Sequence, residues 1–145
     1  MKTMKLFLAV LLLGLFALTS SAQPPKTVTC EPYPVDYYYL SCFDEIVTGE
    51  LELCVTYWDN GKTQAKFKGS LTGETTGNIY TVSQVENNMY KPWIEGQAAN
   101  YTSTLTLSFC LEGMEVFVIH YTYHYTYNAN GELVVFVDNS VIECY

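Results

Sequence analysis

Polar and apolar residues alternate along most of this chain. Residues 49–58 place apolar side chains at nearly every second position, and residues 101–112 repeat the pattern. A period of two puts one face of a β-strand against a core and the other in solvent. Turn-forming residues such as Asn60-Gly61 and those at 128–131 separate the runs. The alternation predicts strands at 35–40, 49–58, 63–72, 78–86, 101–112, 115–127 and 132–143.

No part of the chain after residue 22 shows apolar residues at helical spacing with capping signals. Tyrosine, threonine, valine and phenylalanine are abundant, and they suit pleated, half-buried surfaces. The pattern therefore predicts an all-β protein, an antiparallel meander of six to seven long strands. We expect the sheet to close into a β-barrel, with a two-sheet β-sandwich as the alternative, because either arrangement buries one face.

The first 22 residues have the composition of a signal peptide. Lys2 and Lys5 precede an apolar run at 6–18, and Ser20 and Ala22 are small residues suited to a cut after Ala22. The run is shorter than the roughly 20 residues of a membrane-spanning helix. We therefore expect a secreted or periplasmic protein with no membrane span in the mature chain.

Two further regions follow the signal. Residues 23–41 are rich in proline and tyrosine and hold four of the five prolines. Because proline lacks a backbone donor, we expect an extended, loosely attached segment that ends in a short strand. Residues 42–145 are expected to form a single β domain.

The charge of the chain is strongly negative. After residue 22 there are five lysines, no arginine and fifteen acids, which gives a net charge of −10. This acidic balance offers no positive surface to nucleic acid or to an anionic membrane. It is typical of a soluble protein outside the cytoplasm, and binding of a cationic partner or a divalent ion is the alternative.

All five cysteines follow residue 22, where export permits disulfides. Because five is an odd number, at least one thiol is free or pairs with another chain. Cys42 precedes the first long strand and Cys144 ends the last, so a closing sheet would bring them together. Cys54 and Cys110 fall on the solvent side of their strands and are expected to bridge neighbouring strands. Cys30 is then the odd thiol. Any one of the five cysteines could be left unpaired, however, and the other four can pair in three ways, so fifteen arrangements are possible.

Both histidines lie on one face of the strand at 115–127. His120 and His124 are about 13 Å apart at roughly 3.3 Å per residue, too far to bind one metal ion together. We expect them to face solvent beside threonines. Carboxylates are scattered, and no nucleophile elbow, phosphate loop or Cys-x-x-Cys motif is present. We therefore predict no catalytic residue, no metal site and no cofactor.

The other face of the same strand carries a row of tyrosines: Tyr121, Tyr123, Tyr125 and Tyr127. Tyrosine buries a large area while it presents a hydroxyl group. In a barrel this row would line a pocket for an apolar or sugar-like ligand, so these four are the candidate ligand-binding residues. Cross-strand packing is the alternative interpretation.

The terminal hairpin also carries a resemblance. It combines a His-containing strand, the turn at 128–132 and the segments 137–139 and 143–144, and the chain adds Ser-Ser-Ala-Gln at 20–23 and Thr-Gly-Asn-Ile-Tyr at 76–80. In these motifs the chain resembles small secreted all-β proteins of Bacteroidota-type bacteria. The resemblance implies export and an all-β fold and supplies no active site.

These features favour a non-catalytic exported β domain that binds an unknown small molecule or protein. A structural or surface-associated protein and a small hydrolase are the alternatives. A deep aromatic-lined cavity would favour binding, and a filled interior with an exposed apolar patch would favour a structural role. A hydrolase would need His120 or His124 beside a carboxylate in a cleft.

Overall fold

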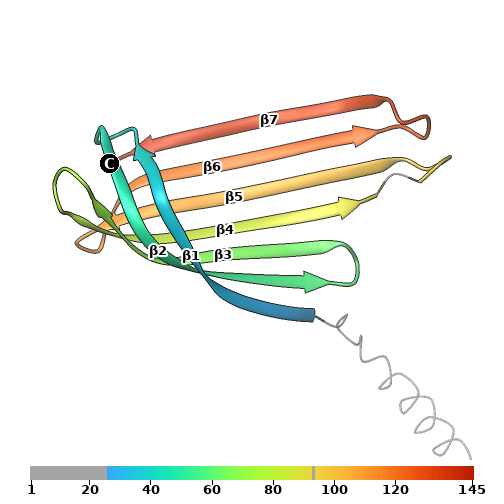
Figure 1. Cartoon of the computed structure of the whole chain (residues 1–145). Helices are drawn as coiled ribbons and strands as arrows, with labels where there is room; N and C mark the ends of the chain where they lie inside the picture. The colour runs from blue at the N-terminus through green and yellow to red at the C-terminus, as the bar shows by residue number, and fades with distance from the viewer. Residues whose placement is uncertain (1–25, 93) are drawn as a thin grey trace, which may run out of the picture.

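The computed structural model describes residues 26–92 and 94–145, and they form seven strands and no helix (Figure 1). The strands are β1 (Lys26–Leu40), β2 (Glu45–Trp58), β3 (Lys62–Gly73), β4 (Ile79–Lys91), β5 (Ala99–Leu111), β6 (Met114–Tyr127) and β7 (Leu133–Cys144). The all-β prediction is confirmed. The expected signal peptide and its cut after Ala22 lie outside the described residues. Within those residues no helix is long and apolar enough to cross a membrane.

All seven strands belong to one antiparallel sheet, in the order β1-β2-β3-β4-β5-β6-β7. Each strand pairs with its neighbour in sequence, so the predicted meander is confirmed. The two outer strands, β1 and β7, do not pair with each other, and the sheet is therefore open. The expected β-barrel is wrong, and because a single sheet holds every strand, the two-sheet sandwich does not form either.

The first hairpin explains why the sheet stays open. β1 and β2 cross one face of the sheet, which we call the inner face, instead of pairing with the free edge of β7 (Figure 1). Gly49 and Gly69 take φ values of 151° and 153° at the bend. A Cβ at Gly69 would lie 3.0 Å from Cδ2 of Leu51, and one at Gly49 would lie 3.1 Å from Cδ2 of Leu71. Glycine at both positions therefore allows β2 and β3 to bend this tightly.

The core lies beneath the crossing hairpin, at the end of the sheet where β1 turns into β2. Phe109 stacks on Tyr38 of β1 with ring centroids 5.4 Å apart, and it meets Phe117 edge-on at 5.6 Å. Nine buried side chains make up this core cluster: Leu40, Val47, Leu51, Leu71, Tyr80, Val82, Leu107, Phe109 and Phe117. The crossing hairpin thus takes the place of a second layer over one half of the inner face.

β1 begins at Lys26, in a segment expected to be loosely attached. Pro32 and Pro34 keep a continuous register with Glu52 and Glu50 of β2. Proline is tolerated here because β1 is an edge strand, whose outward side needs no donor. From residue 26 onward, the expected tail is therefore part of the sheet.

Two disulfides fasten this hairpin. Cys30 and Cys54 are direct partners in the β1–β2 register, and Cys42 at the hairpin tip is joined to Cys144 at the end of β7. The second pair is the one expected from the sequence. The expected Cys54–Cys110 bridge is wrong, because three inter-strand steps of about 4.8 Å separate β2 from β5. Cys110, and not Cys30, is the free thiol of the described chain. Two disulfides indicate an oxidising compartment, extracellular or periplasmic.

Candidate binding site on the inner face

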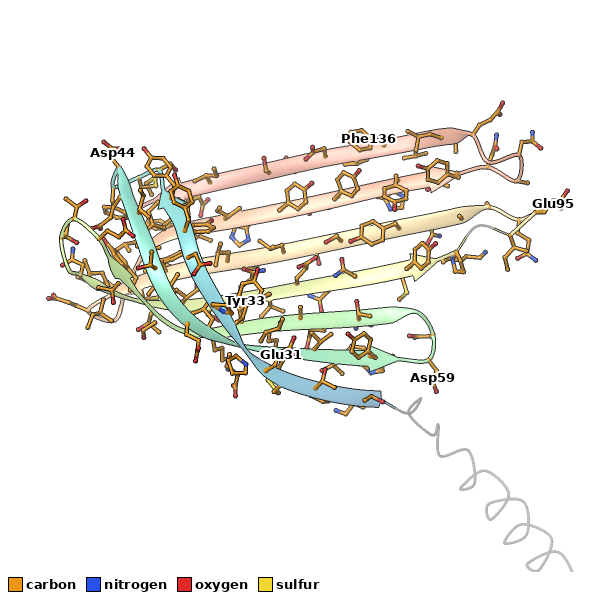
Figure 2. All side chains as sticks on the ribbon, in the orientation of Figure 1. Glu31, Tyr33, Asp44, Asp59, Glu95 and Phe136 are labelled. Atoms are coloured by element: carbon orange, nitrogen blue, oxygen red, sulfur yellow. A yellow bond between two sulfur atoms is a disulfide. The ribbon has the colours of Figure 1, made fainter. Side chains whose placement is uncertain are left out.

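Aromatic side chains continue the inner face beyond the core cluster. Tyr101 stacks on Tyr125 with ring centroids 5.1 Å apart, and Tyr123 meets Phe136 edge-on at 5.3 Å. Such pairs stabilise each other beyond the area they bury. Six side chains from β5, β6 and β7 form what we call the aromatic platform: Tyr101, Tyr121, Tyr123, Tyr125, Tyr127 and Phe136. Figure 2 shows aromatic rings standing on these strands, clear of the crossing β1 and β2.

The strand register explains why these rings share one face. Phe109 and Phe117, both in the core cluster, are direct partners on β5 and β6. Counting in steps of two from Phe117 along β6 reaches Tyr121, and three further steps reach Tyr127. The four tyrosines that the sequence marked as candidate ligand-binding residues therefore lie on the same face as the core, and each is half-buried.

The hydroxyls of two platform tyrosines, Tyr121 and Tyr125, are protonated at neutral pH. Burial raises the pKa of Tyr121, and the negative charge of Asp138 on the neighbouring β7 raises it further. Burial also raises the pKa of Tyr125, with smaller contributions from the tyrosines around it. These groups therefore act as neutral hydrogen-bond donors and acceptors and carry no negative charge of their own.

A hydrogen-bonded row of polar side chains borders the platform on β4 and β5. The Tyr101 hydroxyl donates to Oδ1 of Asn88 at 2.7 Å, and Nδ2 of Asn88 donates to Oε1 of Glu86 at 3.1 Å. Ser103, only 5% exposed, donates to the same Glu86 oxygen at 3.4 Å. The row fixes an acid and an amide beside aromatic rings, an arrangement that suits orienting a ligand in a mostly apolar site.

A groove adjoins this surface on the core side. It has a volume of about 470 Å³ and runs between β1 and the inner face of β2 to β5. Tyr33 and Pro34 form its β1 wall, and Phe67, Gln84 and Leu107 lie among the residues of its floor. One register step further along the sheet come Glu86 and Tyr121. The groove and the platform are therefore neighbouring parts of one face, although the four expected tyrosines do not line the groove itself.

The part of the groove wall formed by Tyr33 and Pro34 was missed because the sequence predicted a loose tail there, with a strand only at 35–40. β1 shifts register between Val35 and Tyr38, and this irregularity lies directly over the groove. Tyr33, which Figure 2 labels, meets Phe67 of β3 edge-on with ring centroids 5.1 Å apart, and both side chains line the groove. The signal available in the sequence was the tyrosine content of 33–39, which exceeds what a tail needs.

One buried carboxylate links strands at the end of the sheet that holds the core cluster. Glu45, 2% exposed, accepts hydrogen bonds from the backbone N and Oγ1 of Thr76 at 2.9 and 2.7 Å and from the Tyr80 hydroxyl at 2.8 Å. Burial acts to raise the pKa of Glu45, but these hydrogen bonds outweigh it and the pKa is lowered. Burial, followed by the Glu45 hydrogen bond, raises the pKa of Tyr80. Glu45 thus ties the start of β2 to the β3–β4 turn.

Both histidines lie on the outer face, opposite the platform. Nδ1 of His124 is 2.7 Å from Oγ1 of Thr102, its Nε2 is 3.1 Å from Oγ1 of Thr126, and Nδ1 of His120 is 3.3 Å from Oγ1 of Thr106. The expected position beside threonines is what the structure shows. His120 is exposed, whereas His124 is half-buried. The structure does not bring either histidine to the candidate site.

In the described part of the chain, no group of three or more His, Cys, Asp or Glu side chains is placed to hold a metal ion.

Comparison with family models, with curated proteins and with solved structures found no match for this chain. The open, curled antiparallel sheet and its aromatic inner face therefore define the protein as an all-β domain with one candidate binding surface.

Proposed function

We propose that this protein is an exported, non-catalytic domain that binds a ligand on its inner face. The observation that carries the proposal is the aromatic platform, which continues the core face outward and leaves its tyrosines half-buried. A row of rings that served packing alone would be covered by another layer, and here β1 and β2 cover only the core half. The fixed polar row of Glu86 and Asn88 beside the rings adds the means to orient what binds.

The chemistry of the surface favours a neutral ligand with flat, weakly polar faces, such as a saccharide chain. Ring faces of tyrosine take up apolar CH surfaces, while their hydroxyls and the Glu86 carboxylate match the hydroxyl groups of a sugar. Polyanions are disfavoured by the net charge of −10 after residue 22. A ligand laid along β5 and β6 would extend from the platform into the groove beneath Tyr33.

The test is binding of soluble neutral oligosaccharides measured by titration calorimetry. Tyr123→Ala is expected to weaken binding at least about tenfold, equivalent to about 1.4 kcal/mol, because the ring is central to the platform. Tyr145→Ala is the matched control, since Tyr145 is an exposed tyrosine beyond the end of β7 that lies outside the platform. Equal binding by Tyr123→Ala and the wild type would overturn the proposed site, and absence of binding across the panel would overturn the saccharide class.

A structural or surface-associated role is the second candidate, and one observation favours it. Apolar side chains of β7 are exposed on both faces of the strand: Leu133, Val134, Val135, Phe136, Val137, Val141 and Ile142. Such an edge is typical of proteins that associate with other chains. The hydrolase alternative has no comparable support, because His120 and His124 bond to threonines away from the groove.

We also propose export by a signal peptide that is cut after Ala22, and a kinship with the small secreted all-β proteins of Bacteroidota-type bacteria that the terminal hairpin resembles. Two disulfides support an oxidising location. Sequencing of the mature N-terminus tests the cut: it should begin at Gln23. A mature chain that keeps residues 6–18 would contradict it.

A further inference from the structure

The two edges of the sheet differ in how they are protected. β1 carries Pro32 and Pro34, which lack a backbone donor. It also carries two charged side chains, Glu31 and Asp36, on either side of these prolines. Prolines and charges of this kind discourage another strand from pairing with an edge. β7 has no proline, and its exposed residues include Phe136 at 55%, which Figure 2 labels, and Ile142 at 54%. One edge is therefore blocked, and the other is left available for pairing.

We propose that two copies of this chain associate through β7, pairing edge to edge and antiparallel about a two-fold axis at Asn139. The two sheets then form one continuous sheet with both inner faces on the same side. This inference goes beyond the ligand-binding proposal and does not depend on it.

The hydrogen bonding of β7 to β6 shows which backbone groups are available. The N–H of Tyr145 donates to the carbonyl of Val116 at 3.1 Å, one position beyond the Phe117–Cys144 pair that ends the β6–β7 register. In an antiparallel pair, bonded and non-bonded positions alternate. Odd-numbered residues from 137 to 145 therefore bond to β6, and even-numbered ones direct their N–H and C=O groups outward. The outward positions are Phe136, Asp138, Ser140 and Ile142.

The sequence of β7 is self-complementary in this register. With Asn139 on the two-fold axis, Val137 lies opposite Val141 of the second copy on the outer face. On the inner face Phe136 lies opposite Ile142, and Asp138 lies opposite Ser140. Apolar residues thus meet apolar residues on both faces, as stable cross-strand pairs require, and each pair occurs twice because the interface is isologous.

Neighbouring registers are less favourable. An axis at Asp138 would place the two Asp138 carboxylates directly opposite each other, and like charges in that position are destabilising. An axis at Ser140 would place Val137 opposite Glu143 and Phe136 opposite Cys144, and so would lose both apolar pairs. Only one acid, Asp138, lies between residues 133 and 142. The strongly acidic chain therefore presents its least charged strand to the second copy.

The test uses charge at the paired positions 137 and 141, which lie about 13 Å apart within one strand and so do not contact each other in a single copy. Val137→Lys together with Val141→Lys places lysine opposite lysine in both outer-face pairs. This double variant is expected to raise the dissociation constant of the dimer at least tenfold, measured by sedimentation velocity. Val137→Lys together with Val141→Glu places opposite charges together and is expected to restore it.

Thr122→Lys is the matched control, because Thr122 is exposed on the outer face of β6, beside Asn139 but away from the edge. It adds one of the two positive charges that the Lys/Lys variant carries, and it should leave the dimer intact. Circular dichroism of each variant verifies that the sheet is folded. A monomeric wild type at high protein concentration overturns the inference. A Lys/Lys variant as dimeric as the wild type, or a Lys/Glu variant as weak as Lys/Lys, overturns the register and with it the proposed interface.

Discussion

Cys144, the last residue of β7, is joined by a disulfide to Cys42 at the tip of the first hairpin, 102 positions earlier in the chain. Their Cα atoms are 5.8 Å apart. The bond links the two outermost parts of an open sheet at one end. It takes the role that strand pairing would have in a closed barrel, and the opposite end of the sheet has no such link among the described residues.

The two disulfides are expected to differ in their contribution to stability. The chain-entropy relation gives about 4.7 kcal/mol for a loop of 102 residues and about 3.4 kcal/mol for the 24-residue loop between Cys30 and Cys54. Urea unfolding should therefore show a larger loss for Cys42→Ser/Cys144→Ser than for Cys30→Ser/Cys54→Ser. The second double variant is the natural control, because β1 and β2 stay paired without the bond. The reverse order of stabilities would contradict this account.

The odd thiol should be Cys110. Denatured protein that has never met a reductant is expected to react with one equivalent of a thiol reagent, and peptide mapping should find the label on Cys110. The native protein should react more slowly, because this side chain is half-buried. Label found mainly on Cys30 would show that the β1–β2 bridge does not form.

Glu45→Gln should destabilise the fold. The substitution replaces a carboxylate that accepts three hydrogen bonds with an amide whose NH₂ group faces the same donors, at a cost of about 1.5–3 kcal/mol. Glu74→Gln, at an exposed glutamate in the adjacent turn, should change the free energy of unfolding by less than about 0.5 kcal/mol. Urea unfolding of the two variants makes the comparison, and equal effects would argue against a special role for Glu45.

The same carboxylate sets an acid limit on stability. The pKa of Glu45 is lowered in the folded protein from an ordinary value of 4.5. Its stabilising contribution is therefore fully present above that value and is lost as the pH falls through the folded-state pKa. The stability difference between wild type and Glu45→Gln should be constant near neutrality and should shrink below about pH 4.5. A difference that grows on acidification would mean that the pKa is raised instead.

Gly73 should be coupled to Glu45. A Cβ at Gly73 would lie 2.5 Å from Cδ of Glu45, closer than any contact the buried side chain tolerates. Gly73→Ala is expected to cost about 1–3 kcal/mol in the wild type. In a Glu45→Ala background the cost should fall, since the obstructing carboxylate is gone. A double-mutant cycle by urea unfolding measures this coupling, and additive effects would place the origin of the strain elsewhere.

Strand content was predictable because alternation is a local property. The runs from Gly49 to Trp58 and from Tyr101 to Leu111 show a period of two in the sequence itself, and the structure has strands there. The first part of β1, residues 26–34, was missed because prolines argue against a strand unless it lies at an edge, and edge position depends on the whole sheet. For the same reason closure was predicted wrongly: the tight bend at Gly49 and Gly69 sends the first hairpin across the sheet, and alternation carries no information about bending.

The candidate site was predictable only in part. Alternation placed the β6 tyrosines on one face, and that face is the inner one. Asn88 was missed because the predicted strand at 78–86 ended before it, whereas β4 continues to Lys91. Glu45 was missed because it precedes the first clear run, and its burial depends on Thr76 and Tyr80 from a distant turn. Contacts between strands far apart in sequence leave no mark on local periodicity.

Fastening at a single end has a consequence for the motions of the sheet. The core cluster, the Cys42–Cys144 bond and the Glu45 hydrogen bonds all lie near the turns at 41–44, 74–78 and 112–113. The far strand ends, which carry the aromatic platform, are held by backbone ladders and by contacts among half-exposed side chains, and they contain none of the nine core-cluster residues. Local opening costs least where buried apolar contacts are few. The platform half is therefore the part of the sheet that we expect to change its curvature most easily while the anchored half stays fixed, and the proposed ligand would bind on this more adaptable half.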